Sequence, residues 1–255
     1  MKHKFILIFC LLTGLAAEAQ FKEPSYSFAV VPTLGNRLIS FKSGGSAYVK
    51  DSLKKADGWR DAIGASVIFG FKSGKTSRIF IGFQFHNFGF TRKKENIRFK
   101  DTIHPDIGIM NDLSQTGNNY VDFNYRYMYL AVPFLMSKQI SGKNMKSSTL
   151  HLLFGGSLAG LVKHDIKAQF HGFSAFGKKE FKLEDKESQP GLLNGNLHIG
   201  LRLENLVYGK STFVFVQPTV YVPILGANYG EQRHHLFALG LEVGLMYQPN
   251  KEKLP

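Results

Sequence analysis

The feature that most constrains the fold of this chain is an alternation, residue by residue, of large apolar side chains with small or polar ones. In the stretch 193–204 one parity carries Leu193, Leu197, Ile199, Leu201 and Leu203, and the other carries mostly Asn, His, Gly and Arg. Successive side chains of a β-strand point to opposite faces, so the pattern predicts strands with one apolar and one polar face. No stretch carries a convincing helical stripe, and we therefore expect an all-β protein.

Eight such segments follow one another, separated by clusters of Gly, Asn, Ser and Lys. Their approximate bounds are Tyr26–Leu34, Trp59–Lys72, Arg78–Phe90, Tyr120–Lys138, Thr149–Val162, Leu192–Glu204, Thr212–Ile224 and His235–Tyr247. In the fourth segment we expect the large face to hold Val121, Phe123, Tyr125, Tyr127 and Tyr129. The opposite face of that segment would hold Asp122, Asn124 and Arg126.

Two architectures produce this alternation. A soluble sandwich or lipocalin-like barrel packs the apolar face inward, whereas a transmembrane barrel turns it towards lipid and keeps the polar face inside. An eight-stranded barrel has a narrow lumen, which rows of Leu, Ile, Phe and Tyr from every strand would overfill. The sequence therefore predicts a closed, eight-stranded antiparallel transmembrane β-barrel with an up-and-down meander.

The spacing of the segments favours the same architecture. The connections 73–77, 139–148 and 205–211 are short, whereas 35–58, 91–119 and 163–191 are long and 226–234 is intermediate. Short turns at one end and long loops at the other are typical of outer-membrane barrels, with both termini in the periplasm. An extra hairpin within 163–191 would raise the number of strands from eight to ten.

The N-terminus has the order of a secretory signal peptide. Lys2 and Lys4 precede an apolar stretch, and Ala17-Glu18-Ala19 forms a small-residue cleavage site. We expect residues 1–19 to be a signal peptide and residues 20–255 to be one outer-membrane barrel domain with a short periplasmic tail. Beyond that stretch no apolar run reaches the roughly 18 residues that a spanning helix needs.

The net charge of +13 is spread along the chain. Export, and the lack of any zinc-finger, helix-turn-helix or ribonucleoprotein pattern, argue against a nucleic-acid partner. The single cysteine, Cys10, lies within the predicted signal peptide, so no disulfide is expected.

Charged residues on the polar parity form the candidate site. Buried charges must be paired. We therefore predict a structural charge network inside the lumen that fills the barrel and fixes its shape, and the alternative is a gated or selective polar pathway. The network would comprise Arg60, Asp122, Arg126, Arg202, Glu204 and Glu242.

Three catalytic or ligand-binding patterns are weak. Ser73-Gly74-Lys75-Thr76 resembles the end of a phosphate-binding loop, but a strand follows it where that loop requires a helix. Gly155-Gly156-Ser157 approximates a nucleophile elbow, but Ser157 falls in mid-strand with inward parity. The adjacent His234 and His235 point to opposite faces of a strand, so they do not form a strand-based metal pair.

Two segments carry a family resemblance. YRYMYLAVPFLMSK at 125–138 and HLLFGGSLAGLV at 151–162 are similar to consecutive strands of the PorT-like outer-membrane β-barrel proteins of Bacteroidetes. The resemblance implies an eight-stranded barrel of the OmpA-like kind. One namesake of that family belongs to a secretion and gliding apparatus, and the family carries no catalytic residues to transfer.

Together these patterns predict an integral outer-membrane protein without cofactor or metal, and not an enzyme. We expect it to act as a structural or binding component through its long extracellular loops, in contact with outer-membrane lipid and with envelope or secretion-system proteins. The alternatives are a small pore or transport protein and a lipid-modifying outer-membrane enzyme. The specific partner and the oligomeric state are left open.

Overall fold

A computed structural model describes residues 22–41, 47–95, 102–104, 108–110, 120–141, 148–171, 180–183, 190–208, 211–228 and 232–249. Within them, eight long antiparallel strands form a closed ring. In ring order they are β1 (Lys22–Phe41), β3 (Arg60–Lys72), β4 (Ser77–Glu95), β7 (Tyr120–Ser141), β8 (Ser148–His171), β10 (Leu193–Tyr208), β11 (Thr212–Pro223) and β12 (Gln232–Tyr247). The predicted signal peptide lies outside the described residues.

Hydrogen bonding between β1 and β12 closes the ring, where Tyr26 lies opposite Tyr247 and Phe41 opposite Gln232. Every ring strand pairs with its sequence neighbour in the ring, so the predicted closed meander is confirmed. Closure leaves none of these eight strands with a free edge along the barrel wall. The start of β1 and the end of β12 share the end of the barrel that carries the short turns, which we call the short-turn end; the opposite end is the long-loop end.

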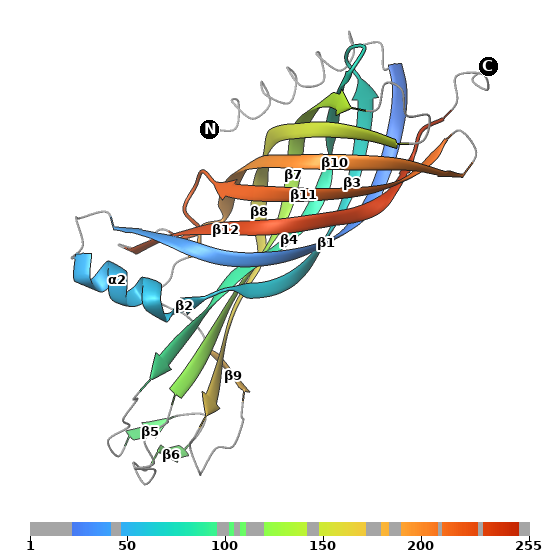
Figure 1. Cartoon of the computed structure of the whole chain (residues 1–255). Coiled ribbons are helices and arrows are strands. Elements are labelled where there is room, and N and C mark those ends of the chain that lie inside the picture. Colours follow the sequence, from blue (N-terminus) through green and yellow to red (C-terminus); the bar gives the residue numbers. More distant parts are fainter. Residues whose placement is uncertain are drawn as a thin grey trace, which may run out of the picture.

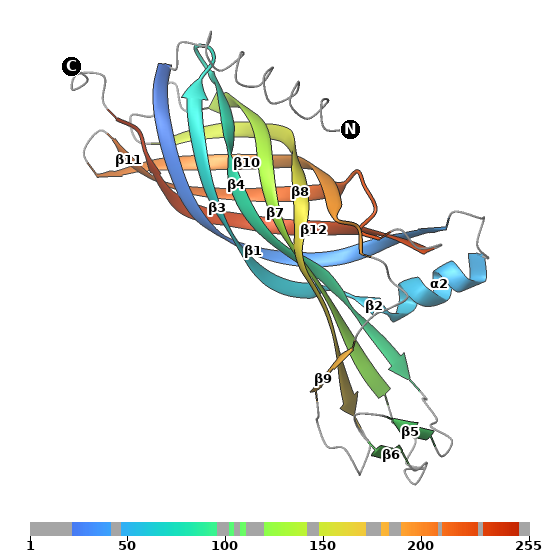
Figure 2. The ribbon, with the colours of Figure 1, turned by 180° about the vertical axis from the view of Figure 1, so that it is seen from behind.

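At the long-loop end the ring divides into two diverging parts (Figure 1). Pairing between β3 and β4 stops at Ala65–Phe85, whereas β4, β7 and β8 stay paired as far as Glu95, Tyr120 and His171. The outer extension, which we define as residues 86–95, 120–128 and 162–171, therefore continues β4, β7 and β8 as paired strands (Figure 2). The paired ends of β1 and β12 leave in another direction, towards α2 (Ala47–Ala56).

Four short strands and one helix lie among the segments expected to be loops. β2 (Asp57–Gly58) pairs with β4, and β5 (Thr102–His104) pairs with β6 (Gly108–Met110). β9 (Glu180–Leu183) pairs with the outer end of β8 and does not enter the ring, which therefore keeps eight strands. The expectation of no helix was wrong for α2, whose ten residues follow β1.

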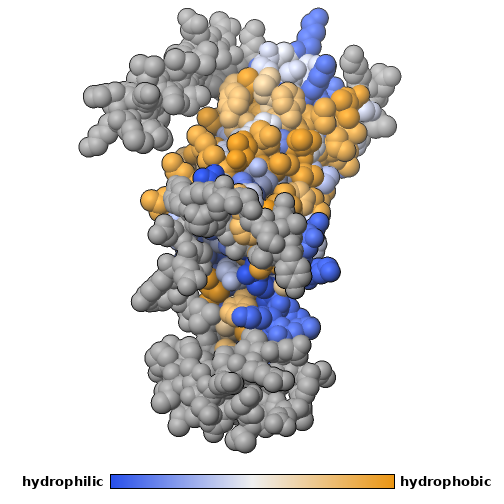
Figure 3. Space-filling model, turned by 90° about the vertical axis from the view of Figure 1, so that its left-hand side faces the viewer, coloured by the Kyte–Doolittle hydropathy of each residue, from blue (hydrophilic) through white to orange (hydrophobic). Residues whose placement is uncertain are grey.

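An apolar belt surrounds the barrel, as the alternation predicted. On β10 and β12 the exposed side chains include Leu197, Leu201, Leu241 and Leu245, and the residues between them are mostly buried. Figure 3 shows this belt as a continuous apolar surface, with charged residues gathered beyond it towards the outer extension. Among the described helices none is long and apolar enough to cross a membrane.

The predicted orientation of β7 was wrong. Tyr127 and Tyr129 are 0% exposed and lie inside the barrel, whereas Leu130, Val132 and Phe134 of the opposite parity face outward. A strand needs only about 9–11 residues to cross the hydrocarbon layer, and β7 has 22. Its N-terminal half lies beyond the belt, where lipid does not dictate which face is apolar.

The close crossing of the two diverging parts requires glycine. A Cβ added to Gly35 on β1 would lie 2.6 Å from the carbonyl oxygen of Gly89 on β4. Any larger side chain at position 35 would push the backbones apart. This contact brings the end of β1 onto the base of the outer extension.

Candidate functional site

The half of the lumen nearest the short turns contains an enclosed charge cluster. Arg202 and Glu204 are two residues apart on β10 and both point inward, and each is only 2% exposed. The Nε of Arg202 donates to Oε1 of Glu204 at 2.8 Å, and Nη1 of Arg78 lies 3.1 Å from Oε2 of the same carboxylate. Glu204 therefore holds two guanidinium groups, one fully enclosed and one at the mouth of the lumen.

The Arg202 guanidinium is also held by uncharged groups. Its carbon lies 3.7 Å from the ring centre of Phe215 and 5.1 Å from that of Phe80. Nη2 donates to the hydroxyl of Ser27 at 3.2 Å. Side chains from β1, β4, β10 and β11 thus converge on one cation, which links opposite walls of the barrel.

Glu242 on β12 accepts hydrogen bonds deeper in the lumen. Donors to its carboxylate are Nε2 of Gln217 at 2.9 Å, the hydroxyl of Tyr221 at 3.2 Å and Oγ of Ser66 at 3.4 Å. Nε2 of Gln84 also donates to it at 3.5 Å, so the donors come from β11, β3 and β4. The carboxylate is therefore fully desolvated and held by uncharged donors.

The half of the lumen nearest the long loops is filled with aromatic side chains. Phe88, Tyr127, Tyr129 and Tyr221 are all fully buried and belong to one cluster. Between this cluster and the charged half, Oγ of Ser157 lies 2.9 Å from Nε2 of His198. The described interior therefore holds large aromatic side chains as well as polar and charged ones.

The structure divides the six charges predicted to form one network. Arg202, Glu204 and Glu242 lie together in the enclosed half, but Arg60 and Arg126 lie at the long-loop end, where both donate to Oδ1 of Asn87, at 3.2 and 3.3 Å. Asp122 lies farther out, 3.2 Å from Nε2 of His171. Arg126 and Asp122 occupy the exterior parity of β7, so placing these two in the lumen was wrong for the same reason as the placement of Tyr127.

A second buried ion cluster was missed. Asp57 on β2 receives a bidentate interaction from Arg37, with distances of 2.7 and 3.0 Å, and Nε of Arg92 donates to it at 3.0 Å. Nη1 of Arg37 also lies 2.6 Å from Nε2 of His234. Burial raises the pKa of the Asp57 carboxyl above its usual value, and the neighbouring Arg37 opposes this shift.

The sequence contained one signal for this cluster. Alternation continues beyond Leu34 through Arg37 and Ile39, which are buried, and Leu38, which is exposed. Ending the predicted strand at Leu34 hid the inward position of Arg37. The partnership with Asp57 depends on the pairing of β2 with β4, which no local pattern indicated.

The weak catalytic patterns have structural roles. Residues 73–76 form the turn between β3 and β4, in which the amide of Ser73 donates to the carbonyl of Ser77 at 3.0 Å. Ser157 lies in mid-strand and points inward. Among the described residues no group of three or more His, Cys, Asp or Glu side chains is arranged to hold a metal ion.

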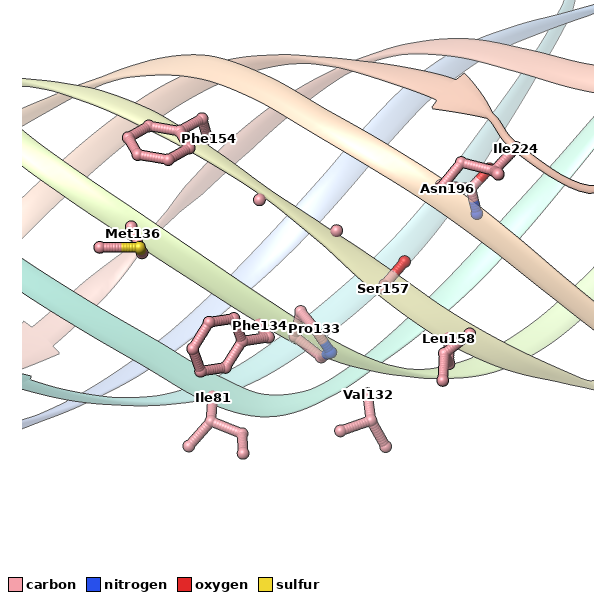
Figure 4. Close-up of a pocket in the computed structure, with 12 residues that line it drawn as sticks. Ile81, Val132, Pro133, Phe134, Met136, Phe154, Ser157, Leu158, Asn196 and Ile224 are labelled. Atoms are coloured by element: carbon pink, nitrogen blue, oxygen red, sulfur yellow. The ribbon is translucent and has the colours of Figure 1, made fainter. Parts of the chain in front are cut away.

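An apolar groove of about 460 Å³ crosses the outer wall of the barrel between β7, β8 and β10. Its sides are formed by Val132, Phe134, Phe154 and Leu158 (Figure 4). The groove exists because Gly156 presents no side chain to the exterior between Phe154 and Leu158. It opens onto the apolar belt and exposes almost no polar surface.

The outer extension presents a polar, ordered face. The Lys93 ammonium lies 4.2 Å from the ring centre of Tyr120, which stacks on His171 at 4.4 Å. Lys93 also pairs with Glu95 at 2.9 Å, and this hydrogen bond raises the pKa of Lys93. Lys93, Glu95, Tyr120 and His171 thus form a row of aromatic and charged groups across the paired strands.

The sequence matches no known family model and no curated protein. Three solved outer-membrane proteins are similar to this chain over most of its length. The attachment invasion locus protein Ail of Yersinia pestis is 9% identical, with 88% of this chain and 99% of that chain covered and a TM-score of 0.31. Neisserial surface protein A is 8% identical, with 87% and 97% covered and a TM-score of 0.35.

The outer membrane protease OmpT of Escherichia coli is 9% identical, with 90% of this chain and 98% of that chain covered and a TM-score of 0.40. The chain is thus similar to small outer-membrane β-barrels. The identities are too low to transfer a residue role or an activity from any of the three.

Proposed function

We propose that this chain is an integral outer-membrane protein with a non-catalytic role, in which a rigid barrel presents the outer extension to a macromolecular partner outside the cell. The observation that carries the proposal is the continuity of β4, β7 and β8 from the apolar belt into the outer extension. In this arrangement the short-turn end faces the periplasm and the long-loop end faces outward.

Membrane placement is supported by the belt and by ring closure. Leu, Ile, Val and Phe side chains are exposed on every side of the barrel wall. Monomeric soluble proteins rarely expose an apolar surface of this extent. A closed ring also satisfies the backbone hydrogen bonds that an open sheet would leave unpaired in hydrocarbon. The predicted signal peptide supplies the route of export.

A role in binding is favoured over transport and catalysis. Buried aromatic side chains and the Arg202–Glu204 pair occupy the lumen, and this packing favours a closed interior over an open pore. Ser157 and His198 are hydrogen-bonded to each other inside the barrel, away from any substrate in the membrane.

The resemblance of 125–138 and 151–162 to PorT-like proteins makes an envelope secretion or gliding assembly our preferred class of partner. That resemblance rests on sequence alone. A partner of this class would be a protein, and it would meet the polar face of the outer extension.

Membrane insertion is tested by fractionation and gel mobility. We expect the mature chain to resist alkaline extraction of envelopes, to need detergent for release, and to migrate differently in SDS gels before and after boiling. Release into the soluble fraction by alkali would refute the placement. Discrete conductance steps in planar bilayers, or altered lipid A mass spectra on deletion of the gene, would instead support the pore or the enzyme.

Partner binding is tested by site-specific photo-crosslinking in the native envelope. A photoreactive residue at Lys93, in the outer extension, should give a defined protein adduct. The matched control is Lys138, an exposed lysine on β7 near the short-turn end. Equal adducts at both positions, or none at Lys93, would refute a role for the outer extension.

A further inference from the structure

A second groove, of about 540 Å³, lies outside the barrel at the long-loop end, between the ends of β1 and β3 and the C-terminal turn of α2. Its lining divides into two parts. Leu38, Trp59 and Phe237 form an apolar side, and Lys54 of α2 supplies a cationic side. Arg37 and Asp57 form its base.

The apolar side is continuous with the belt. Leu38 is 61% exposed and Trp59 is 50% exposed, and both have the parity that carries the lipid-facing residues of β1 and β3. The rings of Trp59 and Phe237 pack edge to face with centroids 5.8 Å apart. An acyl chain lying against β1 could therefore run directly into the groove.

Within the groove lining, Lys54 faces no unpaired acid; Asp51, three residues earlier on α2, does not line the groove. Asp57 is the one acid in the lining, and Arg37 and Arg92 already engage its two oxygens. No acid in the described part of the chain lies within ion-pair distance of Lys54. On the exterior of β12, Arg233 lies opposite Ser40 and adds a second exposed cation at the same end of the wall.

We propose that this groove binds a phosphorylated glycolipid of the outer leaflet, with a phosphate near Lys54 and an acyl chain against Leu38, Trp59 and Phe237. The inference rests on the outward placement of the long-loop end argued above. Two features support this occupant. The ammonium group of Lys54 complements an anionic headgroup, and the apolar side of the groove leads from that lysine into the hydrocarbon layer.

Trp59 is the only tryptophan in the chain, so its fluorescence reports on the groove without labelling. The purified full barrel in detergent micelles is titrated with bisphosphorylated lipid A, with the same lipid A after dephosphorylation, and with phosphatidylglycerol. We expect saturable changes with bisphosphorylated lipid A, and binding at least several times weaker for the other two.

The charge is tested with matched variants. Lys54→Gln should weaken binding of bisphosphorylated lipid A about fivefold, because one lysine near an anionic headgroup contributes roughly that factor. Lys55→Gln is the control, because Lys55 is the next residue of the same helical turn but does not line the groove. We expect its affinity to stay within twofold of the wild type. Both lysines are exposed, so neither variant should impair folding.

Equal affinity with and without the phosphates would overturn the inference, and so would equal weakening by Lys54→Gln and Lys55→Gln or no response of Trp59 to lipid A. Tighter binding of phosphatidylglycerol would also overturn it, since the groove would then select a phospholipid. A protein that needs detergent for release and changes its gel mobility on boiling can still give one of these results. In that case the proposed function stands and only the lipid site is refuted.

Discussion

The enclosed ion cluster gives a sharp test of how charge stabilises this barrel. Replacing Glu204 by Ala removes both hydrogen-bonded oxygens that face Arg202 and Arg78. Arg78 can turn towards water at the mouth of the lumen, but Arg202 stays enclosed by the walls. The substitution therefore leaves one buried cation without its carboxylate.

The expected cost is about 3–5 kcal/mol, the range for breaking a buried ion pair by removing one partner. The distances lead to a similar value, because two hydrogen bonds to a charged group contribute roughly 1.5–3 kcal/mol each. Part of the loss should be recovered when the cation is removed as well. For Arg202→Met with Glu204→Ala we expect a coupling energy of about 2 kcal/mol relative to the sum of the single changes.

The measurement is reversible urea unfolding from phospholipid vesicles, followed by the fluorescence of Trp59. Glu95→Ala is the control, because Glu95 is 63% exposed and pairs with Lys93 on the outer extension. An exposed pair of this kind contributes less than about 1 kcal/mol. If Glu204→Ala costs no more than Glu95→Ala, or if the double substitution is additive, the cluster does not stabilise the barrel as argued.

Three further substitutions probe the belt, the aromatic filling and the crossing of the two parts. Leu201→Arg, on the lipid face, should destabilise the barrel in vesicles by about 2–4 kcal/mol, and a neutral result would mean that Leu201 does not contact lipid. Tyr129→Ala should cost about 3–5 kcal/mol in urea unfolding because it leaves a cavity in a closed cluster, whereas a loss below 1 kcal/mol would indicate a loosely packed interior. Gly35→Ala should lower the free energy of unfolding by about 1–3 kcal/mol, because the added methyl group clashes with Gly89. Gly160→Ala is the control, because its methyl group would meet open space, and it should change the free energy of unfolding by no more than about 0.5 kcal/mol. Equal effects of the two substitutions would contradict the close crossing.

The strand plan was predictable because lipid and lumen impose opposite chemistry on alternate residues. Leu201 and Arg202 are neighbours in sequence, yet one faces the belt and the other is enclosed. This contrast operates only where a strand crosses hydrocarbon. In the outer half of β7 neither face contacts lipid, so the parity of Tyr127 could not be read from apolarity alone.

Charge partners were harder to predict, because they depend on which strands face each other across the lumen. Arg78 follows a turn, and nothing in the sequence around it indicated that its side chain reaches Glu204 on the far wall. Arg37 and Asp57 are twenty residues apart and meet only because β2 pairs with β4. Parity gives the face on which a residue lies, whereas the stagger of the barrel decides which residues on that face can touch.

In the proposed orientation, the length of β8 sets how far the protein extends from the outer face of the membrane. Its 24 residues would span about 80 Å along the strand at about 3.3 Å per residue, and crossing the hydrocarbon layer uses only about 9–11 of them. The ten residues 162–171 lie in the outer extension and account for about 33 Å along the strand. A platform at that height clears the lipid headgroups and their first sugars, so bulky molecules that cannot approach the bilayer itself can still dock on it.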